Sequence, residues 1–393
     1  MHTQLTEASV HEKLQEFYKF FPEKLEEAVE ETTAHLLEML LKEEIDLLVD
    51  AGRYERNERR KAHRNGHYVR HLISHHGLLR VRVPRLREHG VEFASLARYR
   101  RYSGEVGELI RGLFFAGVST RKMGLVMERL LGTRVSAQMV SRIAQQMDNE
   151  VRLYHSRVLA DEYRYLFLDG IVQSEHGLGG GLRGPVLVAY GITRDGRREV
   201  IDHMRAGSES ENAWEGFLNS LYRRGLTGDR LDLIVADGCK GLWNALERVY
   251  PGVPRQLCWA HKIRNIQEKL PKKAWATCGE EAKEIYRQET KDDAAECYFA
   301  WQKKWRSVYP EAVKCLRRDI DKLLIFHLCP RQHRTTVRTT NPIERLFREV
   351  RRRTRPMGSF TNSRSIDRIT YGIFWFINRH WEATRLATFT QKS

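Results

Sequence analysis

The chain of 393 residues predicts a mixed α/β domain preceded by a mostly helical, basic region. From about residue 161, short apolar runs alternate with helix-periodic segments, a pattern typical of helices packed on a sheet. The residues before that point lack the alternation and instead show helical periodicity around one short β element. This length suits roughly two or three domains.

Charge is distributed unevenly along the chain. Lys and Arg outnumber Asp and Glu by 67 to 51, and the resulting pI near 9.6 favours a polyanionic partner such as nucleic acid. Residues 1–50 carry 13 acidic and 4 basic side chains, whereas residues 51–102 carry 14 basic and 4 acidic ones. We therefore expect a helical region at 1–50 that could support dimerisation. A DNA-binding segment should follow at 51–103, with phosphate contacts from Arg59, Arg60, Lys61 and Arg64.

The composition does not suit a secreted or membrane protein. Glu7, Glu12 and Glu16 interrupt any apolar signal sequence. The apolar run "YGIFWFI" is far shorter than the ~20 residues that cross a bilayer. The six cysteines show no disulfide pattern, which indicates a reducing cytoplasm.

The first region predicts helices and then a β element. Residues 10–50 predict two amphipathic helices, with an apolar stripe made by Leu36, Leu37, Met39, Leu40, Leu41, Ile45, Leu47 and Leu48. The basic run after residue 53 ends in a turn signal, Asn65-Gly66. The alternating "LLRVRVPR" then predicts a short strand, which Pro84 confines to an edge or an end.

Residues 104–154 predict a helix-turn-helix unit. Ser119 and Ser136 are candidate N-caps of two helices joined by a short glycine turn. Such a unit would present Gln138, Ser141, Arg142 and Gln145 to the major groove of DNA. Capped helix pairs are also common in helical domains that bind no DNA, so both interpretations stay open.

The region 155–393 predicts the α/β domain. Three strands come first, the second and third joined by a hairpin at Asp195-Gly196. A helix at 211–225, the strand "LDLIVADG", another helix and a short strand around "PRQLCWAH" follow. Residues 262–326 are highly charged and helix-periodic, and we expect a helical insertion over 262–335.

Three carboxylates stand out in this domain. Asp169 and Asp237 each follow an apolar strand, where ligand sites of α/β sheets form, although Asp-Gly after a strand is also a common turn. Glu344 follows Asn341-Pro342, which could make it merely a capping-box residue. The same helix, however, places Arg348, Arg351 and Arg355 on the face of Glu344.

Gathering three carboxylates in a cleft is unfavourable unless cations neutralise them. Crowding raises at least one carboxylate pKa, and hard oxygen ligands suit Mg²⁺ or Mn²⁺. Two such ions can assist phosphodiester displacement. The spacing therefore suggests a hypothesis of two ions held by Asp169, Asp237 and Glu344.

The chain resembles the Mutator-type transposases of bacterial insertion sequences over nearly its full length. The likeness rests on "RNGHY", "VRVPRLR", "LDG", "VADGCKGLWNAL", "CWAHKIRNI" and, most specifically, "TTNPIERLFREVRRRTRPMGSF". The resemblance implies a ribonuclease-H-like catalytic fold with Asp169, Asp237 and Glu344 as its Asp-Asp-Glu triad. Phe347 departs from the pattern, because a polar residue such as asparagine is expected there.

The resemblance also implies a Cys-x-x-His element, here Cys258 to His261, on the strand next to Asp237. His261 could contact the scissile phosphate as a catalytic residue, or it could be a buried structural histidine. A third alternative is a zinc site completed by Cys329 and His333, since the two pairs have plausible ligand spacing.

The implied function is that of a transposase in the bacterial cytoplasm, associated with the nucleoid. It would bind the terminal inverted repeats of its element, hydrolyse a phosphodiester to free a 3′-hydroxyl, and join that end to target DNA. We expect a homodimer, because two ends must be brought together. The arginines Arg345, Arg348, Arg351, Arg352, Arg353 and Arg355 would grip DNA phosphates. The alternatives are a nuclease or resolvase without strand transfer, and a catalytically inactive DNA-binding regulator.

Overall fold

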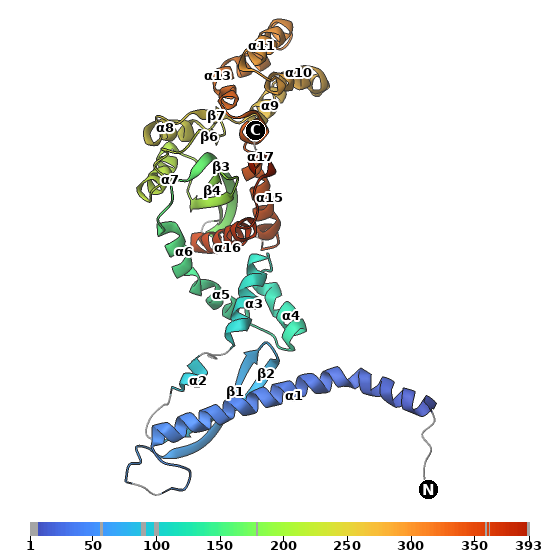
Figure 1. Ribbon diagram of the computed structural model, residues 1–393, viewed down its shortest axis with the longest axis vertical. Helices are drawn as coiled ribbons and strands as arrows, with labels where there is room; N and C mark the ends of the chain where they lie inside the picture. The colour runs from blue at the N-terminus through green and yellow to red at the C-terminus, as the bar shows by residue number, and fades with distance from the viewer. Residues whose placement is uncertain are drawn as a thin grey trace. The chain divides into compact units, whose positions relative to one another are not determined.

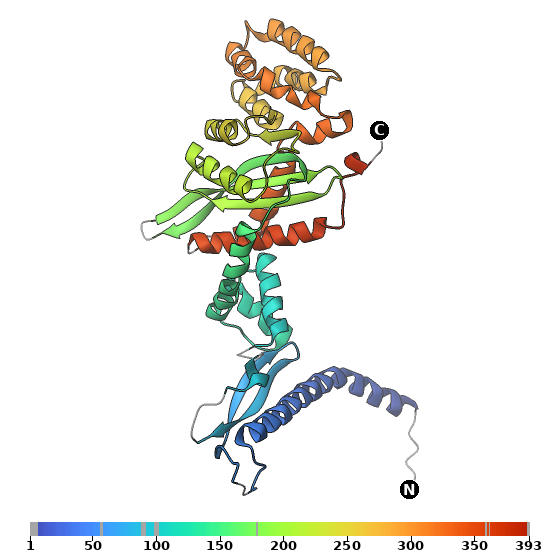
Figure 2. The same ribbon diagram turned by 60° about the vertical axis from the view of Figure 1, so that its left-hand side comes forward.

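The computed structural model describes residues 7–55, 58–87, 92–97, 102–177, 180–357, 360 and 362–390 (Figures 1 and 2). The chain divides into two compact units, one formed by residues 1–114 and 118–145 and the other by residues 115–117 and 146–393. Each unit has its own hydrophobic core. In the described part of the chain, no helix is both long enough and apolar enough to cross a membrane.

The first unit begins with one long helix, α1 (Glu7–Val49). The prediction of two helices over residues 10–50 is therefore wrong. No glycine interrupts this segment, and Glu, Leu, Ala and Lys, all good helix formers, dominate it. These residues keep the helix continuous on both sides of Pro22, which cannot donate a backbone hydrogen bond.

Among the α1 side chains that the structure describes, one row is buried. Leu37, Leu41, Ile45 and Val49, spaced four residues apart, pack against a two-stranded hairpin. The wider apolar stripe predicted from the sequence is wrong. The hairpin is too narrow to cover more than one row of side chains, and five members of that stripe are exposed: Leu36, Met39, Leu40, Leu47 and Leu48.

The hairpin consists of β1 (Arg64–Ser74) and β2 (Gly77–Leu86), paired antiparallel. The predicted strand in "LLRVRVPR" is confirmed, and Pro84 lies on an edge because the sheet has only two strands. The predicted turn at Asn65-Gly66 is wrong. Gly66, with a φ of 69°, lies instead in a β-bulge, where the register shifts between Arg64 and His67.

Short helices follow: α2 (Ala94–Ala97), α3 (Gly104–Phe115), α4 (Thr120–Leu131) and α5 (Ala137–Gln146). The predicted caps are confirmed. Ser119 Oγ accepts from the Lys122 amide at 3.4 Å, and Ser136 Oγ accepts from the Met139 amide at 3.1 Å. Gly132 ends α4 with a φ of 63°, a conformation that favours glycine. Two capped helices joined by a short glycine turn are thus present, and their function as a DNA-binding helix-turn-helix stays a prediction.

The second unit is built on a five-stranded mixed sheet in the order β5–β4–β3–β6–β7. Its strands are β3 (Tyr163–Gly177), β4 (Gly180–Thr193), β5 (Arg198–Arg205), β6 (Leu233–Ala236) and β7 (Arg255–Leu257). The first three are antiparallel neighbours, whereas β6 and β7 run parallel to β3. The predicted hairpin at Asp195-Gly196 is confirmed by the Gly196 φ of 80°.

Helices cover both faces of this sheet (Figure 2). On one face, α7 (Glu211–Arg223) and α8 (Lys240–Val249) pack on Leu166 and Leu168 of β3. Because strand side chains alternate, Phe167 and Asp169 point to the other face. That face is covered by α15 (Asn341–Thr354) and α16 (Ser363–Trp381).

The remaining elements of this unit are also helical, and the helices predicted for residues 262–326 are confirmed. They are α6 (Asp148–Ser156), α9 (Trp259–Gln267), α10 (Glu280–Glu284), α11 (Lys291–Trp305), α12 (Pro310–Arg317), α13 (Ile320–Leu323), α14 (Arg331–Val337) and α17 (Ala387–Thr390). The strand predicted around "PRQLCWAH" is shorter than expected, because α9 begins directly after Cys258.

Two helical glycines should respond oppositely to alanine. A Cβ at Gly372 of α16 would lie 1.8 Å from the Phe115 ring, whereas a Cβ at Gly216 of α7 would meet no atom within 4 Å. We expect Gly216→Ala to stabilise the chain by about 0.5–1 kcal/mol through helix propensity. Gly372→Ala should destabilise it, because the buried ring must move. Chemical denaturation of the two variants measures both signs, and a stabilised Gly372→Ala would contradict the packing described.

Candidate active site

The pairing of β3 with β6 places the first two carboxylates side by side. The parallel pairing of β3 with β6 ends with Leu168 opposite Ala236. The next residues, Asp169 and Asp237, are therefore neighbours just beyond the last paired residues. The prediction that each aspartate ends a strand holds for Asp237 but is wrong for Asp169, because β3 runs on to Gly177. The antiparallel partner β4 supports this extension, pairing Val188 with Asp169.

Both carboxylates are poorly solvated. Asp169 is 8% exposed, and its Oδ1 accepts from the Gly170 amide at 2.8 Å. Burial, followed by repulsion from Asp237, raises the pKa of Asp169 to about 7. Burial also raises the pKa of Asp237, although its Oδ1 accepts from the Cys239 amide at 3.1 Å. The pair is therefore costly to keep charged unless a cation is near.

Glu344 approaches the same place from α15. Its carboxylate Oε1 lies 2.5 Å from Arg264 Nη2 and 3.5 Å from His261 Nε2, both on α9. The capping-box interpretation is wrong: Thr340, not Asn341, precedes the helix, and the Glu344 side chain faces these cations. Its pairing with Arg264 and His261 agrees with a role at the site rather than at the helix end.

The Cys-x-x-His element, Cys258 to His261, contacts Thr340 and Glu344 at the start of α15. Contrary to the prediction of a strand, His261 is on α9. Cys258 Sγ accepts from the Thr340 amide at 3.2 Å and from its hydroxyl at 3.3 Å. Burial raises the pKa of the Cys258 thiol, but hydrogen bonding to His261 and Thr340 outweighs it and lowers the pKa overall. The hydrogen bond with Cys258 in turn raises the pKa of His261 to about 9. His261 thus brings positive charge to the carboxylates.

The zinc alternative is wrong. His333 Nδ1 lies 2.9 Å from the hydroxyl of Tyr165, which also hydrogen-bonds Cys329. Among the described residues, which include all four proposed ligands, no three of Cys258, His261, Cys329 and His333 come within metal-binding distance of one another.

A cavity of about 550 Å³ is lined by Asp169, His261 and Glu344, together with Arg264, Arg345, Arg348 and Arg351. Asp237 is not among its lining residues. Phe347, where a polar residue was expected, is 3% exposed and contributes to its wall. The cavity therefore combines acidic groups at its base with arginines suited to a polyanion.

The other predicted arginines lie elsewhere on α15 and after it. Arg352 and Arg353 pair with Glu349 at 2.8 and 2.5 Å, and the Arg353 side chain is only 12% exposed. Arg355 is exposed beyond the helix end. The helical periodicity thus directs Arg348 and Arg351, rather than Arg352 and Arg353, into the cavity.

The three carboxylates share a region without forming a compact ligand set. Asp169 senses both Asp237 and Glu344 electrostatically. However, the ligand atoms of the three are not all within 4.8 Å of one another in the described chain. Glu209, which the sequence did not single out, also lies near this region. Burial and then repulsion from Asp237 raise its pKa. It belongs to "GSES", a loop after β5 that contacts Gly241 at the start of α8.

The predicted residues of the first unit are exposed to different degrees. Gln138 and Arg142 are exposed on α5, opposite its buried residues Val140, Ile143 and Ala144. In the basic segment Arg59 is exposed, Arg60 donates to the Gly52 carbonyl, and Lys61 pairs with Asp50 at 3.2 Å. Arg64 is tied to α1 through Asp46, with only 21% of its side chain exposed.

Carboxylates on an α/β sheet with arginines beside them are typical of proteins that act on polyanions. The chain belongs to the Mutator family of transposases, whose family description, "Transposase, Mutator family", matches residues 3–384. It is thus an insertion-sequence transposase, an enzyme of DNA transposition. Membership implies DNA binding and the use of divalent metal ions.

Relatives support this assignment across the chain. The transposase for insertion sequence element ISRM5 of Rhizobium meliloti is 33% identical over 360 residues, which cover 91% of this chain and 90% of that protein. The transposase for IS256 in transposon Tn4001 of Staphylococcus aureus is 31% identical over 85% of each chain. A Drosophila P element transposase strand transfer complex shows only a weak likeness, with 10% identity and a TM-score of 0.36 over 72% of this chain and 93% of that one.

The raised pKa of Asp169 predicts a stability cost for charge in the metal-free chain. The folded pKa of about 7 exceeds the ordinary value of 3.8, so this group makes folding less favourable as pH rises from about 4 to 7. Asp169→Asn should therefore raise Tm in the presence of a chelator, by several degrees at pH 8 and less at pH 5.5, since about 1 kcal/mol shifts Tm by roughly 2–4 °C at this size. The exposed Asp321→Asn serves as control. An equal gain at both pH values would contradict the burial argument.

Proposed function

We propose that this transposase hydrolyses a phosphodiester at each end of its insertion sequence and joins the freed 3′-hydroxyl to target DNA at one site built from Asp169, Asp237 and Glu344. The observation that carries the proposal is the β3–β6 register, which makes the two aspartates neighbours. The sheet order, with three antiparallel strands followed by two parallel ones, supports a ribonuclease-H-like interpretation of the fold.

The residues present fit two Mg²⁺ or Mn²⁺ ions. Asp169, Asp237 and Glu344 supply hard oxygen donors, and the raised pKa values of both aspartates indicate that cations would stabilise their charged forms. Two bound ions would activate the attacking oxygen and stabilise the leaving one. Glu344 would complete the ligand set by exchanging its ion pair with Arg264 for a metal bond.

The surrounding side chains would position the DNA. Arg348 and Arg351 face the cavity and can bind phosphates next to the scissile bond. Arg264, once released by Glu344, can join them. His261, held cationic by Cys258, can neutralise charge on the phosphate undergoing attack. Cys258 acts only by fixing His261 and the start of α15.

Recognition of the terminal repeats would belong to the first unit. Its exposed Gln138 and Arg142 lie on the second helix of the helix-turn-helix, where base contacts are made in such motifs. The basic segment, including Arg59, Arg60, Lys61 and Arg64, would add sequence-independent phosphate contacts. A bacterial cytoplasmic location at the nucleoid follows from this substrate.

Replacing any one triad residue should abolish chemistry without abolishing DNA binding. In Asp169→Asn, Asp237→Asn and Glu344→Gln, cleavage of DNA carrying the element ends should fall by roughly a thousandfold or more. Metal-assisted charge stabilisation is worth several kcal/mol, and about 1.4 kcal/mol is a factor of ten. Gel-based mapping of cut positions in Mg²⁺ measures this loss, and Asp321→Asn is the matched control. Retained cleavage in any triad variant would remove that residue from the site.

The same assay separates the alternatives. A pre-cleaved substrate with a 3′-hydroxyl should be joined to target DNA by the wild-type chain. Cleavage without joining would indicate a nuclease or resolvase. Sequence-selective binding with no nicking in Mg²⁺ or Mn²⁺ would indicate an inactive regulator.

The arginines of α15 should contribute unequally to DNA affinity. Arg348→Ala and Arg351→Ala should each flatten the dependence of log affinity on log salt by about 0.9, because each loses one phosphate contact. Arg352→Ala should change the slope less, since its side chain pairs with Glu349 outside the cavity. Fluorescence anisotropy at several salt concentrations gives the slopes. Equal slopes for all three variants would contradict the assignment.

A homodimer would use the uncovered side of α1. Leu36, Met39, Leu40 and Leu47 are all more than half exposed there, although their apolar area favours burial. Leu40→Glu combined with Leu47→Glu should shift the chain toward monomer in sedimentation equilibrium, whereas Leu130→Glu on α4 should not. A monomeric wild-type chain at micromolar concentration with element-end DNA would refute the dimer.

A further inference from the structure

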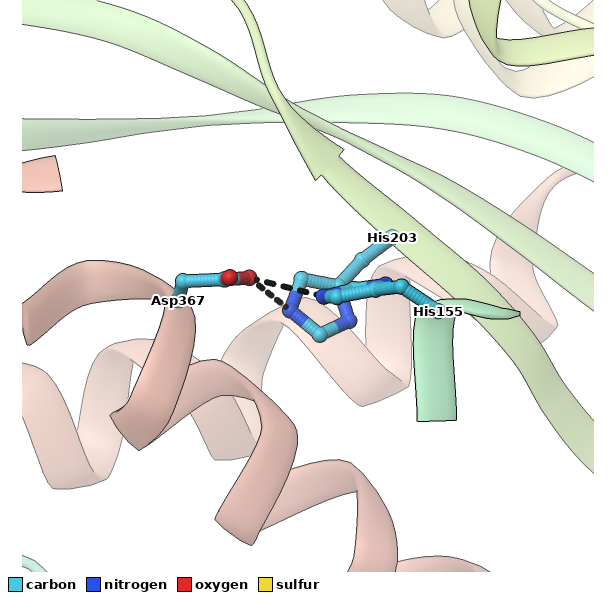
Figure 3. Close-up of side chains that lie close together, drawn as sticks. All are labelled: His155, His203 and Asp367. Atoms are coloured by element: carbon cyan, nitrogen blue, oxygen red, sulfur yellow. Dashed lines mark hydrogen bonds and ion pairs between the residues drawn. The ribbon is translucent and has the colours of Figure 1, made fainter. Parts of the chain in front are cut away.

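A second cluster of potential metal ligands lies outside the candidate active site. It contains His155 near the end of α6, His203 on β5 and Asp367 on α16 (Figure 3). One ligand atom from each lies within 4.8 Å of the others, and no other trio in the described part of the chain meets this distance. Three elements that are far apart in sequence thus bring one side chain each into close contact.

Two of the three distances between these atoms are a little shorter than those of a tetrahedral metal site. Asp367 Oδ1 lies 3.1 Å from His155 Nε2 and 2.9 Å from His203 Nε2. In a zinc site with metal–ligand bonds of about 2.0–2.1 Å, ligand atoms are ~3.3 Å apart. Expansion by a few tenths of an ångström would therefore admit an ion between them.

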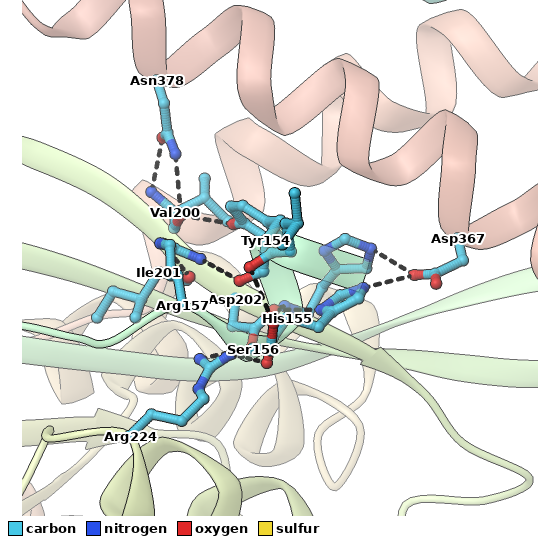
Figure 4. Close-up of polar contacts among 12 residues, drawn as sticks. Tyr154, His155, Ser156, Arg157, Val200, Ile201, Asp202, Arg224, Asp367 and Asn378 are labelled. Atoms are coloured by element: carbon cyan, nitrogen blue, oxygen red, sulfur yellow. Dashed lines mark hydrogen bonds and ion pairs between the residues drawn. The ribbon is translucent and has the colours of Figure 1, made fainter. Parts of the chain in front are cut away.

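A further carboxylate orients His155 as in histidine-ligated metal sites. His155 Nδ1 lies 2.7 Å from Asp202 Oδ1, which leaves Nε2 directed at Asp367 (Figure 4). Arg224 Nη2 holds the other oxygen of Asp202 at 2.7 Å. A carboxylate on the far nitrogen fixes the ring orientation and raises the basicity of the ligating nitrogen.

His203 has one partner, Asp367, and is otherwise poorly satisfied for a buried ring. Its side chain is 1% exposed, and Nε2 lies 2.9 Å from Asp367 Oδ1 in an ion-pair contact that is poorly aligned for a hydrogen bond. Nδ1 has no hydrogen-bond partner among the residues that the structure describes. Buried polar atoms without partners are rare and costly. A metal ion at Nε2 would satisfy the nitrogen that already points at the cluster.

Negative charge surrounds the two imidazoles of the cluster. Asp202 and Asp367 lie on opposite ring nitrogens of His155, and Asp367 Oδ1 also lies 2.9 Å from His203 Nε2. These carboxylates would stabilise a divalent ion placed between the rings.

We propose that His155 Nε2, His203 Nε2 and an Asp367 oxygen bind one divalent transition-metal ion, of which Zn²⁺ is the natural representative. Two imidazoles favour Zn²⁺ over Mg²⁺, which prefers oxygen ligands throughout. The ion would link α6, β5 and α16 through their side chains. Its fourth coordination position would face a cavity of about 350 Å³. This site does not depend on the proposed triad chemistry.

The test uses the full chain and Co²⁺ as a spectroscopic substitute for Zn²⁺. We expect one equivalent of Co²⁺ to give the visible absorption of a tetrahedral site and one equivalent of Zn²⁺ to displace it. Zn²⁺ should also raise Tm by several degrees, whereas Mg²⁺ should not produce this spectrum. A wild-type chain with no tetrahedral Co²⁺ signal overturns the proposal and leaves an ion-pair network only.

Variants locate the ion. His155→Gln, His203→Gln and Asp367→Asn should each weaken Zn²⁺ binding at least tenfold. Since His203 is buried, the half-buried His155 and Asp367 provide ligand variants that fold more readily. His380→Gln on α16 and Asp169→Asn should keep the signal. Signals of equal strength in all variants would place the metal elsewhere and overturn the proposal, and the Asp169→Asn control keeps this outcome distinct from failure of the active-site assignment.

Discussion

The parallel pairing of β3 with β6 is the constraint on which the candidate site of the second unit depends. It lasts for only a few residues and ends where Leu168 meets Ala236. The next residue after each paired segment is an aspartate, so Asp169 and Asp237 lie side by side. Because side chains alternate along β3, Asp169 faces α15 and α16, while Leu168 remains in the opposite core. A slip of one residue would turn Asp169 toward the core that α7 and α8 cover.

The ion pairs at this site involve the third carboxylate. Arg264 and His261 hold Glu344, and Cys258 in turn holds His261. The arrangement keeps Glu344 near Asp169 but outside a compact ligand set. The pKa values of Asp169 and Asp237 stay raised, because burial outweighs the attraction of His261. Asp169 and Glu344 both line the cavity and can be reached from it.

The sequence predicted most of the elements that carry this site, because their signals are local. Strand alternation, the Asp195-Gly196 hairpin and the Ser119 cap each depend on a few adjacent residues. The errors involve competition between distant segments. Whether Asn65-Gly66 makes a turn or a bulge depends on the partner strand β2. Likewise, the row of α1 that becomes buried is decided by the width of the hairpin, which periodicity alone does not encode.

The candidate site was predictable in part. Spacing and resemblance pointed to Asp169, Asp237 and Glu344, and their role in catalysis stays a prediction. Arg264 was missed although it lies in "CWAHKIRNI", because its ion pair with Glu344 joins two helices that are distant in sequence. Glu209 was missed because its proximity to Asp237 depends on the packing of the loop after β5.

The order of the elements along the chain has a consequence for biosynthesis. Phe167 and Tyr190 lie on the sheet face that α15 and α16 cover, and both are buried in the folded protein. A nascent chain that has left the ribosome only as far as α14 lacks both helices, so this apolar face stays uncovered. The sheet can therefore complete its packing only after α16 has been synthesised.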